Sequence, residues 1–215
     1  MGAIARNIAN KITTSGVFTS GAITNSSVTG ITVLANASDG ITFISSQTAS
    51  NSASISFTSG LTSTYKAYKF VCTSIHPRTD DVSFDFNMST DSGSNYNVTK
   101  TTTAFYAYHN ETGADFELAY GADYDLAQST SFQKIFSLIG NGADESTSGT
   151  LTIFNPSSTT YVKHFIARGN VYNRANYTTE WHTAGYGNTT SAINAIRFQM
   201  SSGNFDGTIY MYGIK

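Results

Sequence analysis

Residues 82–88 read Val-Ser-Phe-Asp-Phe-Asn-Met, an unbroken alternation of apolar and polar side chains. Successive side chains of a β-strand point to opposite faces, so this order predicts a strand with one buried and one polar face. The side chains expected to be buried are Val82, Phe84, Phe86 and Met88. The same alternation returns near residues 148–156, 193–200 and 207–214, beside turn-forming Asn-Pro, Ser-Gly and Gly-Asn pairs. This period predicts antiparallel β-structure.

Strand patterns of this kind fill the sequence from residue 41 onward, with turn residues between them. The predicted strands are 41–45, 52–58, 65–73, 82–88, 96–98, 102–109, 116–120, 132–139, 151–154, 161–168, 170–177, 193–200 and 208–214. We expect 132–139 to form a hairpin with 151–154, and 161–168 to pair with 170–177. Residues 122–132 have room for a single helical turn. The spacing predicts an all-β fold over residues 41–215, an antiparallel two-sheet β-sandwich that is jelly-roll-like.

The composition argues against several kinds of partner. Only 12% of residues are charged and the net charge is −2, so there is no basic footprint for nucleic acid and no polybasic patch for a membrane. No stretch approaches the roughly 18 apolar residues of a membrane-spanning helix. The N-terminus lacks the apolar core of a signal peptide, which predicts synthesis in the cytoplasm. The single cysteine, Cys72, excludes an internal disulfide, and its strand-like setting predicts a buried thiol.

Residues 1–40 differ in kind from the rest of the chain. Isoleucines recur every four residues at positions 4, 8 and 12, which is typical of a short amphipathic helix. Apolar singles and pairs then alternate with small polar turns, in pieces too short to bury their own apolar side chains. We interpret this segment as an extended arm that anchors and oligomerises the protein, the alternative being a disordered terminus. The arm residues expected at an interface are Ile4, Ile8, Ile12, Val17, Phe18 and Ile23.

No catalytic, metal or cofactor site is predicted. The four histidines, at positions 76, 109, 164 and 182, have no metal-ligand spacing, and His76 falls in an expected turn. Acidic pairs at 80–81, 123/125 and 144–145 fall in expected loops and do not follow the order of a calcium-binding loop. The sequence leaves open whether calcium binds there. It contains no nucleophile elbow and no phosphate-binding loop.

The most distinctive local cluster is Glu180-Trp181-His182, which contains the only tryptophan. On a strand, Glu180 and His182 share one face and Trp181 takes the other. One interpretation is a tryptophan packed inside the protein with a polar pair outside. The other is an exposed Trp181 that stacks on a sugar, assisted by Tyr177 or Tyr186.

The last third of the chain resembles a known class of protein. The matching residues are 148–156 (Ser-Gly-Thr to Asn-Pro), 193–198 (Ile-Asn-Ala-Ile-Arg-Phe), 201–204 (Ser-Ser-Gly-Asn) and 207–214 (Gly-Thr-Ile-Tyr-Met-Tyr-Gly-Ile). This unit is similar to the end of β-sandwich proteins in particles of tailed bacteriophages, especially marine ones. The resemblance implies a virion structural protein. Such domains occur on tail fibres, knobs and head decorations, so it does not fix a position in the particle.

Two functions follow as hypotheses. The first is a non-enzymatic virion protein, fixed by its arm to other virion proteins of the capsid or tail, with an outward sandwich head and self-association as a homotrimer. The second is a glycan-binding, lectin-like module that attaches to host surface polysaccharide. A depolymerase or esterase is a distant third, because sequence alone supports no pair of catalytic carboxylates.

Overall fold

The structure is a computed structural model that describes residues 40–215. These residues form one compact unit. The predicted arm lies outside the described residues apart from Gly40. The same holds for every expected interface residue of the arm: Ile4, Ile8, Ile12, Val17, Phe18 and Ile23.

The described part of the chain is built from strands, without a helix. The strands are β1 (Ile41–Ser52), β2 (Ser54–Phe57), β3 (Ala67–Pro77), β4 (Val82–Ser89), β5 (Lys100–Asn110), β6 (Phe116–Tyr120), β7 (Gln133–Ile139), β8 (Thr147–Phe154), β9 (Lys163–Tyr172), β10 (Tyr177–Gly187), β11 (Ala195–Met200) and β12 (Phe205–Ile214). All pairings between these strands are antiparallel. The all-β prediction is confirmed.

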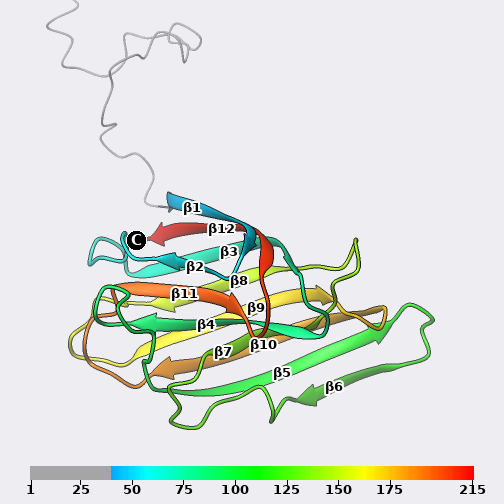
Figure 1. The fold of residues 1–215 in the computed structure, drawn as a ribbon. Helices are drawn as coiled ribbons and strands as arrows, with labels where there is room; N and C mark the ends of the chain where they lie inside the picture. Colours follow the sequence, from blue (N-terminus) through cyan, green and yellow to red (C-terminus); the bar gives the residue numbers. More distant parts are fainter. Residues whose placement is uncertain (1–39) are drawn as a thin grey trace, which may run out of the picture. The chain divides into compact units, whose positions relative to one another are not determined.

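The strands form two sheets that pack face to face (Figure 1). The smaller sheet has the order β2-β11-β4-β7, and the larger has the order β1-β12-β3-β8-β9-β10-β5-β6. The first four strands of the larger sheet and the four of the smaller sheet interleave along the chain as in an eight-stranded jelly roll. The predicted two-sheet, jelly-roll-like sandwich is therefore confirmed.

Two hairpins are inserted into this jelly roll. The β5–β6 hairpin comes between β4 and β7, and the β9–β10 hairpin comes between β8 and β11. Together they extend the larger sheet to eight strands, with β6 as its far edge (Figure 1). The smaller sheet has no strand to cover the inner face of this extension fully. The segment between β6 and β7 covers part of it, because Tyr124 packs on Trp181 with ring centroids 4.6 Å apart.

The core between the sheets is formed by every second side chain along each strand. Val82, Phe84, Phe86 and Met88 are at most 5% exposed, as predicted from the alternation in β4. Rings from the two sheets meet directly, for example Phe86 with Phe165 at 4.9 Å between centroids. Cys72 is buried as expected, and burial raises the pKa of its thiol to about 12.

Three local predictions are wrong. Residues 96–98 form no strand, and residues 122–132 form no helical turn. Strands β7 and β8 do not form a hairpin, because β7 pairs with β4 in the smaller sheet and β8 pairs with β3 and β9 in the larger one. The connection between them crosses from one layer to the other, which alternation within each strand does not reveal.

The pairing expected between 161–168 and 170–177 is also wrong. Strand β9 continues through Gly169 to Tyr172, the turn lies at 173–176, and β9 pairs with β10. Gly169 is not a turn residue, because the Phe136 ring packs directly over its Cα and would collide with any Cβ there. The turn uses Asn173, whose Oδ1 accepts the Ala175 amide at 2.8 Å, and Asn176 in the left-handed region at φ 62°.

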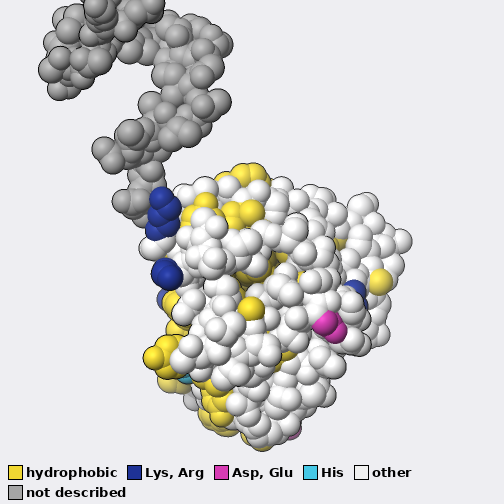
Figure 2. Space-filling model, turned by 90° about the vertical axis from the view of Figure 1, so that its left-hand side faces the viewer, with side chains coloured by type: hydrophobic (Ala, Val, Ile, Leu, Met, Phe, Trp, Pro, Cys, Tyr) yellow, Lys and Arg dark blue, Asp and Glu magenta, His cyan; other side chains and the backbone are white. Residues whose placement is uncertain are grey.

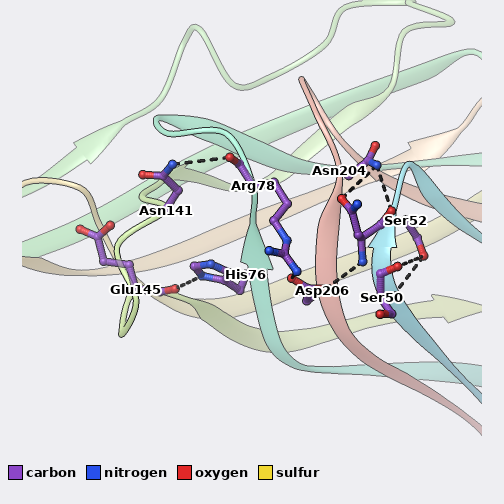
Figure 3. A network of polar contacts seen from close by, with 9 residues as sticks. Ser50, Ser52, His76, Arg78, Asn141, Glu145, Asn204 and Asp206 are labelled. Atoms are coloured by element: carbon purple, nitrogen blue, oxygen red, sulfur yellow. Dashed lines mark hydrogen bonds and ion pairs between the residues drawn. The ribbon is translucent and has the colours of Figure 1, made fainter.

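A polar network joins connections at one end of the jelly roll (Figure 3). The Asp206 carboxylate accepts the Asn51 amide at 2.8 Å and pairs with Arg78 Nη2 at 2.6 Å. Asn204 Nδ2 donates to the Asn51 carbonyl at 2.9 Å. His76 lies within β3 instead of in the expected turn, and its Nδ1 is 2.7 Å from the Glu145 carbonyl oxygen. These contacts join the ends of β1, β3 and β12, which are neighbours in the larger sheet, to the connections that follow β3, β7 and β11.

Candidate functional site

The outer face of the larger sheet, which points away from the smaller sheet, carries an unusual set of exposed side chains. The strand pairing shows which side chains share this face. Phe105 lies opposite His182 of β10 and Tyr120 of β6, and the pairs that follow from strand to strand across the sheet place Phe154 and Ile41 on the same face. Eight of the nine large hydrophobic side chains that are exposed among residues 40–215 lie on this face: Ile41, Phe43, Phe105, Phe116, Leu118, Tyr120, Phe154 and Ile166. Their exposure ranges from 41% to 72%. Exposed apolar side chains gathered on one face are typical of an interaction surface.

A groove of about 550 Å³ runs across this face over β8, β9, β10 and β5. Small side chains, including Ala184 and Thr103, leave it open, and Phe154, Ile166 and Tyr186 also line it. A second hollow of about 510 Å³ adjoins it, since Phe154 and His164 line both. Figure 2 shows one end of the body, where hydrophobic side chains gather toward one margin with a histidine among them.

Tyr186 is the one predicted glycan residue that lines this groove. Its ring is partly exposed and lies edge-on to the His164 ring, with the centroids 6.2 Å apart. The two residues are cross-strand partners, since Tyr186 is opposite His164 in the β9–β10 register. Together they offer aromatic ring faces with a polar phenol and imidazole at the edge, which is a combination that suits either sugars or protein side chains.

A charged cluster lies farther along the same face. The Glu180 carboxylate accepts a hydrogen bond from Arg168 Nε and lies 3.2 Å from His182 Nε2. The Arg168 hydrogen bond is the main reason that the pKa of Glu180 is lowered. The His182 ring is stacked on Phe105, with centroids 4.7 Å apart and planes 6° apart. All three side chains are at least partly exposed, so the cluster orders the surface without contributing much stability.

Of the two interpretations of Glu180-Trp181-His182, the one with an exposed, sugar-stacking Trp181 is wrong. Trp181 is 1% exposed and packs between the rings of Tyr106 and Tyr124, with centroids at 4.7 and 4.6 Å. The alternative interpretation is confirmed, with the tryptophan inside and the polar pair Glu180 and His182 outside.

Tyr177 is also separated from the groove. It shares the strand parity of Trp181, so its ring lies on the opposite face of the sheet from Tyr186. There it contacts Tyr108 at 5.4 Å and donates to the Asp115 carboxylate at 2.8 Å. The structure therefore does not bring Trp181, Tyr177 and Tyr186 together as one glycan platform.

The candidate acidic and histidine residues are dispersed in residues 40–215. In this part of the chain, no group of three or more His, Cys, Asp or Glu side chains is arranged to hold a metal ion. The acidic pairs lie in connections, where Asp81 pairs with Arg174 at 2.8 Å and Asp80 accepts the Asn141 amide at 3.3 Å. Within the same residues, no helix is long and apolar enough to span a membrane.

Buried polar groups on β4 and β5 are features that sequence reasoning missed. Asp85 is 6% exposed, and burial raises the pKa of its carboxyl to about 7, against the hydrogen bond of Ser83 and the charge of Lys134. Lys100 is fully buried, and burial lowers the pKa of its ammonium to about 7. Its Nζ donates to Asn87 Oδ1 at 2.6 Å and to the Val98 carbonyl at 2.7 Å. In the sequence these polar residues occupy the positions expected on the solvent-exposed face of a strand, so nothing in the pattern indicates that they are buried.

No protein-family model, no curated protein and no solved structure matches this chain. The outer face of the larger sheet is therefore assigned as the candidate site from its own side chains alone.

Proposed function

We propose that this chain is a non-enzymatic structural subunit of a tailed-bacteriophage particle, such as a fibre, knob or head-decoration protein. The resemblance of residues 148–214 to such proteins and the jelly-roll body both support this proposal. The observation that carries it is the concentration of eight exposed large hydrophobic side chains on one sheet face. A subunit designed for assembly needs such a face, because burial of apolar area drives association.

The arm and the sheet face have different tasks in this proposal. Residues 1–40 attach the subunit to other virion proteins and hold copies together as a trimer, and the jelly roll lies outward on the particle. The proposed localisation is thus the virion, after assembly in the host cytoplasm. Close spacing on a particle raises the effective concentration of neighbouring heads, so even weak contacts between outer faces become occupied.

Mass spectrometry of purified phage particles whose genome encodes the chain tests this proposal. We expect the intact chain among the particle proteins at a fixed copy number. A chain that lacks residues 1–30 should fold but be absent from particles, whereas the full chain supplied in the same way should be incorporated. Particles that contain none of the chain would refute the proposed function.

A second candidate function, glycan binding, is favoured by one observation. The groove on the outer face has the aromatic rings of Tyr186 and His164 at its side, and threonine side chains along it. Host surface polysaccharide is the proposed ligand class, because sugars bind by stacking on rings while hydroxyl groups hydrogen-bond nearby.

Calorimetric titration with host surface polysaccharide fragments distinguishes this candidate. Binding with millimolar or tighter affinity should be lost in Tyr186→Ala and kept in Tyr177→Ala, since Tyr177 lies on the other face of the sheet. Trp181→Ala is not a suitable probe, because it would disturb the buried aromatic cluster. Equal binding by both tyrosine variants, or no binding by the native chain, would rule out the groove as a glycan site. Cleavage of the polysaccharide by the purified chain would contradict the non-enzymatic proposal.

A further inference from the structure

Strand β6 forms an open edge of the larger sheet. Among residues 40–215 it pairs with β5 alone, and no strand lies beyond it (Figure 1). Three of its five residues are large, apolar and strongly exposed: Phe116 at 68%, Leu118 at 72% and Tyr120 at 59%. An exposed edge strand with an apolar face is a template for pairing with another strand.

The other three edges of the sandwich have features that discourage such pairing. Strand β1 has register shifts between Phe43 and Ser45 and between Ala49 and Ser52. Strand β2 is only four residues long. Strand β7 has two irregularities in its pairing with β4. The register of β6 against β5 is uninterrupted, and its sequence, Phe-Glu-Leu-Ala-Tyr, contains neither proline nor lysine.

The hydrogen bonds at the two ends of the β5–β6 hairpin show which backbone groups point outward. Gly121 N donates to the Ala104 carbonyl at 2.9 Å, and Asn110 N donates to the Asp115 carbonyl at 2.9 Å. In an antiparallel ladder the bonded residues alternate, so Glu117 and Ala119 direct their amides and carbonyls toward β5. Phe116, Leu118 and Tyr120 therefore direct theirs to the open edge. The residues with exposed apolar side chains also have the outward backbone groups.

We propose that β6 pairs with β6 of a second copy of this chain, antiparallel and across a two-fold axis at Leu118. This register places Leu118 opposite the partner's Leu118, and Phe116 opposite the partner's Tyr120. Outward backbone groups then meet outward backbone groups along the whole strand, and aromatic and aliphatic side chains form cross-strand pairs. The larger sheets of two copies become one continuous sheet.

Charge disfavours the neighbouring register that has its axis at Glu117. With the axis at Leu118, Glu117 lies opposite the partner's Ala119. An axis at Glu117 would place the two carboxylates directly opposite each other, which is unfavourable. Glu117 is also held on the other face of the sheet from Leu118, where Tyr108 donates a hydrogen bond to its Oε2 at 3.2 Å. The strand is thus self-complementary in backbone and apolar side chains, and this register keeps the two Glu117 carboxylates from lying directly opposite each other.

This inference deepens the proposed function, on which its biological meaning rests. A five-residue edge buries little area, so the contact is weak between free copies and is occupied at the high local concentration on a particle. Because the contact is two-fold, a single copy becomes a pair. A trimer held by the arm offers three such edges and becomes a closed six-copy assembly when the two-fold axes lie perpendicular to the three-fold axis.

Sedimentation analysis of the full chain, over concentrations from low to high micromolar, tests the pairing. We expect the mass to double with rising concentration. In Leu118→Lys the doubling should need at least tenfold higher concentration, and in the control Thr90→Lys it should be unchanged. Thr90 is exposed and directly follows β4 of the smaller sheet, so it is not part of the outer face of the larger sheet. A mixture of Leu118→Lys and Leu118→Glu should regain the doubling, because opposite charges then meet at the axis.

Amide hydrogen exchange of the native chain gives a readout that needs no variant. The amides of Phe116, Leu118 and Tyr120 should become protected as concentration rises, while those of Glu117 and Ala119 are protected throughout. Absence of doubling at every concentration, equal effects of Leu118→Lys and Thr90→Lys, or outward amides that stay unprotected would overturn the proposal. None of these results depends on whether particles contain the chain, so failure of the pairing and failure of the proposed function are separate outcomes.

Discussion

Replacement of Phe198 by alanine is the most informative test of the packing between the two sheets. Phe198 lies in the middle of β11, between Ile55 of β2 and Phe86 of β4, and is fully buried. Its ring contacts Phe70 of the larger sheet at 5.4 Å between centroids and is stacked with Phe84 at 5.7 Å. Its side chain therefore joins both layers at one point.

The expected loss of stability follows from these contacts. A fully buried phenylalanine that becomes alanine costs about 3–5 kcal/mol through lost transfer free energy and the cavity that remains. Aromatic pairs add about 0.5–1.5 kcal/mol beyond their buried area. Since the ring has several aromatic neighbours, we predict a loss near the upper end of the cavity range, about 4–5 kcal/mol.

Urea denaturation of the full chain measures this loss. We expect the urea concentration at the midpoint of unfolding to fall. The slope of the unfolding free energy against urea concentration should not change, because unfolding exposes about the same surface in both chains. Phe154→Ala is the matched control, since Phe154 is 41% exposed on the outer face and should cost no more than about 1 kcal/mol. A loss below about 2 kcal/mol for Phe198→Ala, or equal losses for both variants, would refute the assignment of Phe198 to the junction of the layers.

Three further predictions concern buried groups. Burial raises the pKa of Asp85 from 3.8 to about 7, so the stability from its neutral form is complete below about pH 4 and is lost as pH rises to about 7. Over this pH range the free energy of unfolding of the native chain should fall by up to about 4 kcal/mol because of Asp85, and Asp85→Asn should remove that fall. Urea denaturation at a series of pH values measures it, and a variant with the same pH dependence as the native chain would contradict the prediction. Gly169→Ala should cost about 1–3 kcal/mol in the same assay because Phe136 packs on Gly169, and a neutral effect would show that the ring can move. The Cys72 thiol should resist alkylation at pH 8 until urea unfolds the chain, and rapid labelling of the native chain would refute its burial.

The sequence predicted those parts of the fold that follow from local alternation. The inward side chains of β4, the class of the fold and the inner position of Trp181 relative to Glu180 and His182 all follow from a period of two. The same period cannot assign a strand to a sheet, which is why β7 and β8 were expected to pair although they lie in different layers. Gly169 looks like a turn residue in the sequence. Its actual role is to make room for the Phe136 ring, and this contact cannot be seen in the sequence because Phe136 is distant from Gly169 along the chain.

The candidate site was less predictable than the fold. Tyr186 was a candidate contact residue, and it lines the groove on the outer face. In the sequence Phe116, Leu118 and Tyr120 alternate with Asp115, Glu117 and Ala119, which suggests burial on one face. Their exposure arises because they lie on the outer face of the larger sheet, which points away from the smaller sheet, in the edge strand of an inserted hairpin. Only the topology reveals such a position, since an apolar residue in a strand is usually covered.

Covalent footprinting of side chains, on the free chain and on purified particles, tests most directly whether the outer face of the larger sheet is an assembly surface. We predict strong labelling of Phe105, Leu118 and Tyr120 in the free chain at low concentration and clear protection in the particle. Tyr177, which is partly exposed on the opposite face of the sheet, serves as an internal reference. Labelling of the outer face that is the same in the particle and in the free chain would contradict the account.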